Sequence, residues 1–271
     1  MSQSQPIIIF LQGGLGNQLF QYAAGLRLAS DLSGTLWLLP ANENIHSKRD
    51  YRISMMFRGN LAEKYLVNPE NPPVTKLWQQ PGAFDTWEPQ MFANKPAMYI
   101  KGFFQYLPAI QEKVDIICKD IGWTFATIRQ EIAANYRITE PANTVCVHVR
   151  RGDYLKAKPE SHWVLGPDYY IAAIQALQAK LGRPCQWLVV SDDPAWCREQ
   201  PWMRLLKIVE EPDEVASLIL MSLCKGGTVM ANSSFSWWGA QLAGGPAVYP
   251  SKWYKNEKPE LFPAEWIRIE I

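Results

Sequence analysis

Residues 7–39 read IIIFLQGGLGNQLFQYAAGLRLASDLSGTLWLL, and this stretch contains the pattern that decides the fold. The apolar run Ile7–Leu11 is typical of a buried strand, and the loop Gln12–Gln18 that follows it is rich in glycine. Residues Leu19–Leu32 carry apolar side chains at helical spacing, and Thr35–Leu39 is a second short apolar run. A strand, a helix and a second strand in this order form a βαβ unit, which predicts a parallel sheet.

The second half of the chain repeats this alternation of apolar runs and helical patterns. We expect strands at 144–149, 186–190, 205–209 and 227–231, the final strand at 247–249, and helices at 167–181, 213–223 and 235–243. Before them, a strand is expected within 97–103 and helices at about 106–119 and 123–135. The sequence Glu-Pro-Ala-Asn at 140–143 interrupts the pattern, which predicts two α/β domains, 1–140 and 141–271.

Composition excludes several classes of function. The chain has 27 Lys and Arg against 26 Asp and Glu, so it lacks the basic excess of proteins that bind nucleic acid or anionic membranes. Its 5 cysteines include no CxxC pair, which favours reduced thiols in an intracellular compartment. The first apolar run is too short for a signal peptide or a membrane span. We therefore expect a soluble, cytoplasmic protein.

The stretch with the most specific chemistry is VCVHVRRGDY at 145–154. An apolar strand ends there in two neighbouring arginines that repel each other, so a fold that keeps them together usually has an anion to bind. The guanidinium group presents a planar fork of donors that matches phosphate oxygens. Asp153 can orient one guanidinium, and Gly152 permits the turn. These residues predict a diphosphate site at Arg150 and Arg151, with a solvated surface turn as the alternative.

The glycine-rich loop suggests a second contact with a ligand. Its glycines do not complete a dinucleotide-binding motif, because Leu19 occupies the third glycine position, and no Gly-Lys-Ser/Thr follows as in a P-loop. What remains is a backbone that a ligand can approach closely at a helix N-terminus. The candidate residues are Gly14, Gly16, Asn17 and Gln18, and the alternative is a tight turn between strand and helix.

Polar residues also follow two later strands. Adjacent carboxylates such as Asp192 and Asp193 point to opposite faces of a strand, so no metal site is predicted there. Asp192 can instead accept hydrogen bonds from a sugar or base, and Asp193 can cap a helix. Asn232, Ser233 and Ser234 combine a strand end with a helix start, which suits a phosphate, although an ordinary N-cap fits as well.

Four side chains can titrate near these clusters. His148 lies inside the strand before the arginines, where both a buried core histidine and a ligand contact fit the pattern. Glu160 and His162 lie in the loop after the arginine turn, and either can be a general base, with a solvated loop as the alternative. Asp153 is a third candidate for this role. The histidines of the chain do not have the spacing of zinc ligands.

These clusters, in this order, resemble the bacterial-type α-1,2-fucosyltransferases of glycosyltransferase family 11. The matching segments span nearly the whole chain and read GGLGNQLFQY at 13–22, HVRRGDY at 148–154, SDD at 191–193 and NSSFSWW at 232–238. The element HxRRxD is shared by α-1,2-, α-1,6- and O-fucosyltransferases, whereas NSSFSWWG is more particular to the α-1,2 group.

The resemblance implies a GT-B-like fold, in which an N-terminal acceptor-side domain, 1–140, and a C-terminal donor-binding domain, 141–271, are both Rossmann-like and face a cleft. It implies inverting transfer of L-fucose from GDP-β-L-fucose to the 2-hydroxyl of a terminal β-galactoside, with no metal and no other cofactor. The expected partners are GDP-fucose and a β-galactoside oligosaccharide or glycan precursor. Loose association with the machinery of lipid-linked glycans is a further expectation.

The resemblance also assigns roles to individual residues. Arg150 binds the diphosphate and stabilises the departing GDP, Arg151 and Asp153 support this geometry, and His148 lies near the guanine. The catalytic candidates are thus Arg150, Asp153, Glu160 and His162, and the donor-binding candidates are Gly14, Gly16, Asn17, Gln18, His148, Arg150, Arg151, Asp192, Asn232, Ser233 and Ser234. Ser217 occupies a position where the family often has an acidic residue that recognises guanine, so Asp213 or Glu214 would have to substitute.

Two other functions fit the same residues. A non-catalytic module that binds a sugar or a nucleotide would keep the arginines and the aromatic side chains without turnover. A transferase for another nucleotide sugar would keep the diphosphate site and change the base or the sugar. The acceptor, the general base and the oligomeric state stay open at this point.

Overall fold

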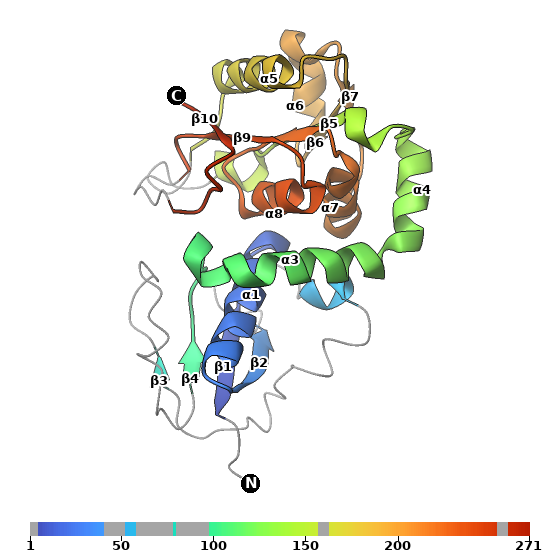
Figure 1. The fold of residues 1–271 in the computed structure, drawn as a ribbon. Coiled ribbons are helices and arrows are strands. Elements are labelled where there is room, and N and C mark those ends of the chain that lie inside the picture. Colours follow the sequence, from blue (N-terminus) through green and yellow to red (C-terminus); the bar gives the residue numbers. More distant parts are fainter. Residues whose placement is uncertain (1–4, 41–51, 58–77, 80–97, 157–162, 254–259) are drawn as a thin grey trace. The chain divides into compact units, whose positions relative to one another are not determined.

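The computed structural model describes residues 5–40, 52–57, 78–79, 98–156, 163–253 and 260–271. The chain forms two compact units, Met1–Thr124 and Phe125–Ile271 (Figure 1). All strand pairings among the described residues are parallel. Strands joined by helices on a parallel sheet confirm the predicted α/β class.

The first unit contains a parallel sheet whose described strands have the order β2-β1-β4-β3. Its elements are β1 (Pro6–Leu11), α1 (Leu15–Asp31), β2 (Thr35–Pro40), the 3₁₀ helix η1 (Ile53–Met56), β3 (Trp78–Gln79), β4 (Met98–Ile100) and α3 (Leu107–Thr124). Strand β1 pairs with β2 on one side and with β4 on the other, so its apolar run is the buried centre of the sheet. The predicted βαβ unit is therefore present.

Helix α1 begins at Leu15, earlier than the predicted start at Leu19. Gly13 has a φ of 79°, a conformation that favours glycine, and Gly14 is the extended N-cap residue. The turn is complete at Gly14, so Gly16, Asn17 and Gln18 already lie in the first helical turns. The backbone of this loop thus meets the N-terminus of α1 directly.

The second unit contains a six-stranded parallel sheet with the order β10-β9-β8-β5-β6-β7. Its strands are β5 (Thr144–Val149), β6 (Gln186–Ser191), β7 (Lys207–Ile208), β8 (Gly227–Val229), β9 (Ala247–Pro250) and β10 (Ile267–Ile269). Its helices are α4 (Ala126–Tyr136), α5 (Pro167–Leu181), α6 (Pro194–Glu199), α7 (Glu214–Leu223) and α8 (Ser234–Ala243), with 3₁₀ turns η3 (Pro141–Asn143), η4 (Gly152–Leu155) and η5 (Pro201–Met203).

Helices cover both faces of this second sheet. In Figure 1, α5 and α6 lie on one side of the sheet, and α7 and α8 lie on the other. Strand β5 lies inside the sheet and is covered on both faces, and as a result every one of its residues is buried. The core on the α5 side includes Val145, Val147, Tyr169 and Leu177.

Most predicted elements of this unit are confirmed, and one expectation is wrong. Strand β5 and helix α5 have the predicted bounds, and α5 ends at Gly182, whose φ is 60°. Strand β9 is not the last strand, because β10 follows it and pairs with it in parallel. Strand β10 has only three residues, Ile-Arg-Ile, and this short alternation of apolar and polar residues lacks the continuous apolar run on which the other strands were predicted. No helix among the described residues is long and apolar enough to cross a membrane.

Candidate active site

The strand order of the second unit marks a place where a ligand can bind. From β5 the chain continues to β6 and β7 on one side, and then crosses to β8, β9 and β10 on the other side. Ligands of open α/β sheets bind at the carboxyl ends of the strands where the order reverses in this way. Arg150 follows β5 and Asn232 lies just beyond β8, so both predicted polar clusters border this switch point.

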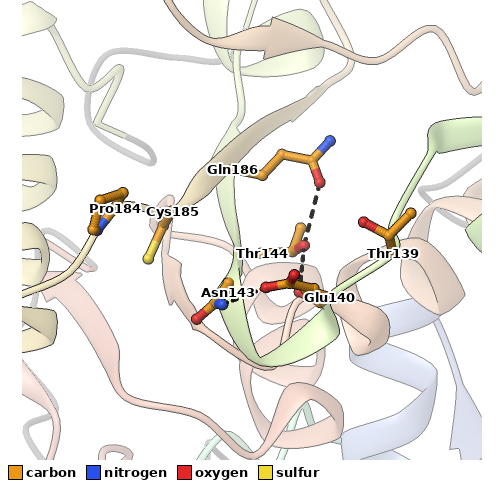
Figure 2. A pocket seen from close by; sticks show the side chains of 7 residues that line it. All are labelled: Thr139, Glu140, Asn143, Thr144, Pro184, Cys185 and Gln186. Carbon is orange, nitrogen blue, oxygen red and sulfur yellow. Dashed lines mark hydrogen bonds between the residues drawn. The ribbon is translucent and has the colours of Figure 1, made fainter.

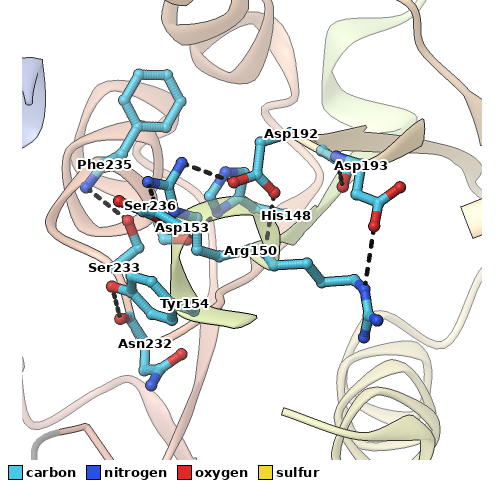
Figure 3. Close-up of polar contacts among 12 residues, drawn as sticks. His148, Arg150, Asp153, Tyr154, Asp192, Asp193, Asn232, Ser233, Phe235 and Ser236 are labelled. Atoms are coloured by element: carbon cyan, nitrogen blue, oxygen red, sulfur yellow. Dashed lines mark hydrogen bonds and ion pairs between the residues drawn. The ribbon is translucent and has the colours of Figure 1, made fainter. Parts of the chain in front are cut away.

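Arg150 lies at the centre of the cluster and is held by two carboxylates (Figure 3). Its Nη2 is 2.6 Å from Asp153 Oδ1, and its Nη1 is 2.9 Å from Asp192 Oδ2. The guanidinium also lies over the ring of Tyr154, 5.3 Å from its centroid. Its remaining nitrogen, Nε, is buried and has no hydrogen-bond partner. A buried donor without a partner is costly, which makes Nε a natural contact for a ligand oxygen.

Arg151 points to a different neighbour. Its Nε pairs with Asp193 Oδ2 at 3.3 Å, and its guanidinium carbon lies 3.8 Å from the centroid of the Trp196 ring. Asp193 caps α6, because its side chain accepts a hydrogen bond from the Trp196 N–H at 3.1 Å. The capping role suggested for Asp193 by the sequence is therefore confirmed. In this structure the contacts of Arg151 fix the turn against α6.

Asp192 organises the turn after β5. Its Oδ1 accepts a hydrogen bond from the backbone N–H of Arg151 at 2.8 Å, and its Oδ2 pairs with Arg150. A Cβ atom on Gly152 would lie only 2.5 Å from Asp192 Oδ2. Glycine at 152 thus allows the carboxylate to approach the turn. Among the described residues no group of His, Cys, Asp or Glu side chains could hold a metal ion.

His148 is buried beneath this cluster, with 4% of its surface exposed. Its Nδ1 lies 2.5 Å from Ser236 Oγ, and that hydroxyl also accepts a hydrogen bond from the Ala231 N–H at 3.0 Å. Burial, and to a lesser degree the charge of Arg150, lowers the pKa of His148 to about 3. His148 is therefore neutral at physiological pH. Its ring links β5 to α8.

The segment after β8 presents a helix N-terminus to the same edge of the sheet. Ser233 Oγ caps α8 by accepting a hydrogen bond from the Phe235 N–H at 3.3 Å, and Ser234 is the first helical residue. Asn232 donates through Nδ2 to the Trp163 carbonyl at 2.9 Å. The backbone carbonyl oxygen of Asn232 accepts a hydrogen bond from the Tyr154 hydroxyl at 3.0 Å. Its buried Oδ1 has no partner, so it can accept from a hydroxyl or N–H donor.

The glycine loop of the first unit is fastened by two glutamines. Gln18 donates to the Gly13 carbonyl at 3.0 Å and accepts at 3.1 Å from the N–H groups of both Arg52 and Ile53. Gln21, which sequence analysis did not single out, uses its amide to bind both backbone groups of Gln12 and the Gly102 carbonyl. The Gln18 amide is thus engaged inside the unit.

The other members of this loop have simpler surroundings. Asn17 is half-buried, and its Oδ1 accepts from Gln105 Nε2 at 2.9 Å. Gly14 caps α1, and Gly16 is buried in the first turn of that helix. A Cβ atom on Gly13 would meet Asn17 Nδ2 at 2.5 Å, so glycine at this position makes room for the Asn17 side chain.

The remaining candidates are two of the possible general bases and the residues expected to recognise guanine. Glu160 and His162 lie outside the described residues. Ser217 is buried and donates to the Glu211 carbonyl at 3.2 Å, and Asp213 caps α7 through the N–H groups of Val215 and Ala216. These contacts are local to the start of α7.

A pocket of about 280 Å³ lies at the amino ends of β5 and β6 in the second sheet (Figure 2). Its lining residues are Thr139, Glu140, Asn143, Thr144, Pro184, Cys185 and Gln186. Its polar side chains largely pair with one another: Asn143 Nδ2 donates to Glu140 Oε2 at 2.6 Å, and Thr144 lies 3.4 Å from Gln186 Oε1. The unpartnered polar atoms of Arg150 and Asn232 instead favour the carboxyl edge as the ligand site.

Comparisons with known proteins show the family of the chain. The family model of glycosyl transferase family 11 matches residues 2–270. The chain is 28% identical to the alpha-1,2-colitosyltransferase of Escherichia coli, over 97% of this chain and 99% of that protein. It is 27% identical to galactoside alpha-(1,2)-fucosyltransferase 2 of Mus musculus, over 95% of this chain and 76% of that protein.

Solved structures show the same fold. The chain is similar to the NodZ alpha-1,6-fucosyltransferase of Bradyrhizobium, co-crystallized with GDP, with a TM-score of 0.53 and 14% identity. This similarity covers 88% of this chain and 92% of that chain. It confirms the predicted GT-B-like fold with Rossmann-like units.

Proposed function

The chain belongs to glycosyl transferase family 11, and we propose that it transfers L-fucose from GDP-β-L-fucose to the 2-hydroxyl of a terminal β-galactoside. The name of the mouse relative, a galactoside alpha-(1,2)-fucosyltransferase, supports fucose as the transferred sugar, a galactoside as the acceptor and the α-1,2 linkage. The observation that carries the proposal is the position of Arg150 at the switch point of the second sheet, with a buried and unpartnered Nε. This is the place and the chemistry that a sugar nucleotide diphosphate requires.

The donor site is proposed to form from two kinds of positive potential. Arg150 supplies a full charge, and the N-terminus of α8, capped by Ser233, supplies N–H groups and the positive end of a helix dipole. Ser234 lies at this helix start, where its hydroxyl can donate to a phosphate oxygen. Asn232 presents an oxygen and would therefore accept from a hydroxyl or N–H of the donor, a role different from the phosphate contact expected from the sequence.

The remaining donor-binding candidates support these groups. Arg151 and Asp192 hold the turn after β5, and His148 ties that strand to α8. In the first unit, the backbone at Gly14 and Gly16 and the side chain of Asn17 are the candidates for contact with the substrate, while Gln18 holds the loop.

The proposed reaction follows from this charge distribution. As the bond between the sugar and the β-phosphate breaks, positive charge develops on the sugar ring and negative charge on the departing GDP. Arg150 stabilises that negative charge, the task that a divalent metal performs in many glycosyltransferases. The acceptor hydroxyl attacks from the opposite face and inverts the anomeric carbon. Asp153, Glu160 and His162 are the candidates for the base that takes its proton.

A sugar nucleotide that carries colitose is a second candidate donor. The alpha-1,2-colitosyltransferase of Escherichia coli matches this chain over nearly the full length of both proteins. The two sugar nucleotides would share the GDP part and differ only in the sugar. We therefore expect competition between them at the same site, with the preferred donor decided by turnover.

The test is transfer from GDP-fucose, and in parallel from GDP-colitose, to a panel of β-galactosides in the presence of EDTA. Product is identified by mass spectrometry and linkage analysis, with α-galactosides as matched acceptor controls. An α-1,2-fucosylated β-galactoside supports the proposal in full. Transfer of colitose but not of fucose would assign GDP-colitose as the donor. GDP binding without any transfer favours a non-catalytic binding module.

A further inference from the structure

The charges around Arg150 do not by themselves favour an anion. The described cluster at the ends of β5 and β6 contains two arginines and three carboxylates, namely Arg150, Arg151, Asp153, Asp192 and Asp193. Arg150 already contacts two of the carboxylates. A diphosphate that approaches it would be repelled by both, unless one of them moves away.

The geometry of the guanidinium shows which carboxylate occupies the donors that a phosphate would bind. In arginine the Nε–H bond runs parallel to one N–H bond of Nη2, and these two donors form a fork that binds two oxygens of a phosphate side by side. On Arg150 this fork is half occupied: Nη2 donates to Asp153 Oδ1 at 2.6 Å, and Nε is buried without a partner. Asp192 binds Nη1, on the other side of the group.

The two carboxylates also differ in how firmly they are held. The side chain of Asp192 is 26% exposed, and both of its oxygens are engaged, one by Arg150 and the other by the Arg151 N–H. The side chain of Asp153 is 54% exposed and lies on the short 3₁₀ turn η4. Water screens and solvates the more exposed carboxylate better, so Asp153 leaves Arg150 at a smaller cost than Asp192 does.

We propose that the donor diphosphate displaces Asp153 from Arg150, and that the released Asp153 carboxylate is the general base of the transfer. This inference rests on the proposed function and adds to it the order of events and the identity of the base. A phosphate group occupies the Nε and Nη2 fork, while Asp192 keeps Nη1 and holds the guanidinium in place. Asp153 becomes available only when the donor is bound, which makes the acceptor the second substrate.

The O–H bond of the acceptor breaks, and its proton passes to a carboxylate oxygen of Asp153. The acceptor oxygen forms a bond to the anomeric carbon of the sugar. The bond from that carbon to the β-phosphate oxygen breaks, and its electron pair leaves with GDP, whose charge is stabilised by Arg150.

The test separates binding from turnover in Asp153→Asn. GDP is titrated into the wild-type protein and the variant by calorimetry, and the variant is expected to bind GDP about two- to fivefold more tightly, because Nη2 no longer holds a carboxylate. Turnover at saturating donor and acceptor is expected to fall by about 100-fold or more, because the base is gone. Asp153→Ser is a second variant with the same two expectations, should the first fold poorly.

Opposite signs for binding and turnover distinguish this role from a structural one, since a merely loosened turn weakens both. Asp192→Asn is the matched control: it removes the charge at Nη1, leaves the fork occupied by Asp153, and is expected to tighten GDP binding less than Asp153→Asn does. Glu160→Gln and His162→Gln compare the other two candidate bases, and each is expected to lower turnover less than Asp153→Asn does.

Three results would overturn the inference. Equal or weaker GDP binding by Asp153→Asn contradicts the exchange of partners at Arg150. Retained turnover in that variant, with a loss in Glu160→Gln or His162→Gln, places the base elsewhere. If the wild-type protein neither binds GDP nor transfers sugar, the proposed function fails first, and this outcome is distinguishable because it does not depend on any variant.

Discussion

The Nδ1 atom of His148 lies 2.5 Å from the hydroxyl oxygen of Ser236, and this pair joins the strand before Arg150 to the helix behind the proposed phosphate site. Both side chains are buried, and Ser236 Oγ also accepts from the Ala231 N–H. The pair therefore fixes two segments that border the switch point relative to each other.

Loss of the Ser236 hydroxyl should lower the stability of the second unit. In Ser236→Ala the Ala231 N–H and His148 Nδ1 lose their common partner inside the protein, which is expected to cost about 1–3 kcal/mol in the free energy of unfolding. Chemical denaturation followed by fluorescence measures this cost. Ser234→Ala, at a half-buried position of the same helix, is the control, with an expected change within about 0.5 kcal/mol. Equal costs at both sites would contradict the structural role of the pair.

His148 should also make stability depend on pH. Its pKa is lowered from 6.5 to about 3 in the folded protein, mainly by burial. Between these two values the unfolded chain binds a proton at His148 that the folded chain does not, so acid favours unfolding. The contribution is absent above about pH 6.5 and grows as the pH falls toward 3, with a slope of about 1.4 kcal/mol per pH unit.

The measurement compares the wild-type protein with His148→Gln in urea titrations between about pH 4.5 and 7. The free energy of unfolding of the wild-type protein should fall with decreasing pH more steeply than that of the variant, by about 1.4 kcal/mol per unit. Other titrating groups are common to both proteins and cancel in the difference. Parallel curves would show that His148 titrates alike in the folded and unfolded chains.

The two arginines of the turn should respond differently to substitution. Arg150→Ala removes the group proposed to stabilise the departing GDP and is expected to lower kcat by about two orders of magnitude or more. Arg151 stacks on Trp196 and pairs with Asp193, so Arg151→Ala should mainly destabilise the fold, by about 1–3 kcal/mol, with a smaller effect on kcat. Near-normal turnover of Arg150→Ala would refute its role.

Gly152 should tolerate no side chain. In Gly152→Ala the new Cβ atom would lie 2.5 Å from Asp192 Oδ2, and the carboxylate that holds both Arg150 and the Arg151 N–H would have to move. We expect weaker GDP binding and a lower melting temperature. Gly166→Ala is the matched control, because nothing lies within 4 Å of its Cβ position. Similar GDP affinity in both variants would show that the position of Asp192 does not matter for the site.

Local signals explain which parts of the fold could be predicted. Strand β5 is one uninterrupted apolar run, and α5 lies between Pro167 and Gly182, so both have clear boundaries in the sequence. Strand β10 pairs with β9, and its three residues Ile-Arg-Ile alternate between apolar and polar side chains and form no continuous apolar run. Helix α1 begins earlier than predicted because residues of the glycine loop also form its first turns.

The candidate site shows the same division. The motifs themselves predict that Arg150 and Asp192 lie at strand ends, because each follows an apolar run. Their contact depends on the register of β5 against β6, which places Val149 opposite Ser191. Tertiary pairing of this kind is absent from the local pattern. The same is true of Gln21, whose partners Gln12 and Gly102 are brought together only by the first sheet.

Gln18 and Asn17, which the sequence places side by side as donor-binding candidates, should separate into a structural and a functional residue. Gln18→Leu leaves the N–H groups of Arg52 and Ile53 without their acceptor, and the free energy of unfolding is expected to fall by about 1–3 kcal/mol. Asn17 is half-buried in the first turn of α1, so Asn17→Ala should change stability less and transfer activity more. Thermal melting and the KM for GDP-fucose, measured on both variants, check this division. An equal loss of stability in the two variants, with unchanged KM in Asn17→Ala, would remove Asn17 from the proposed site.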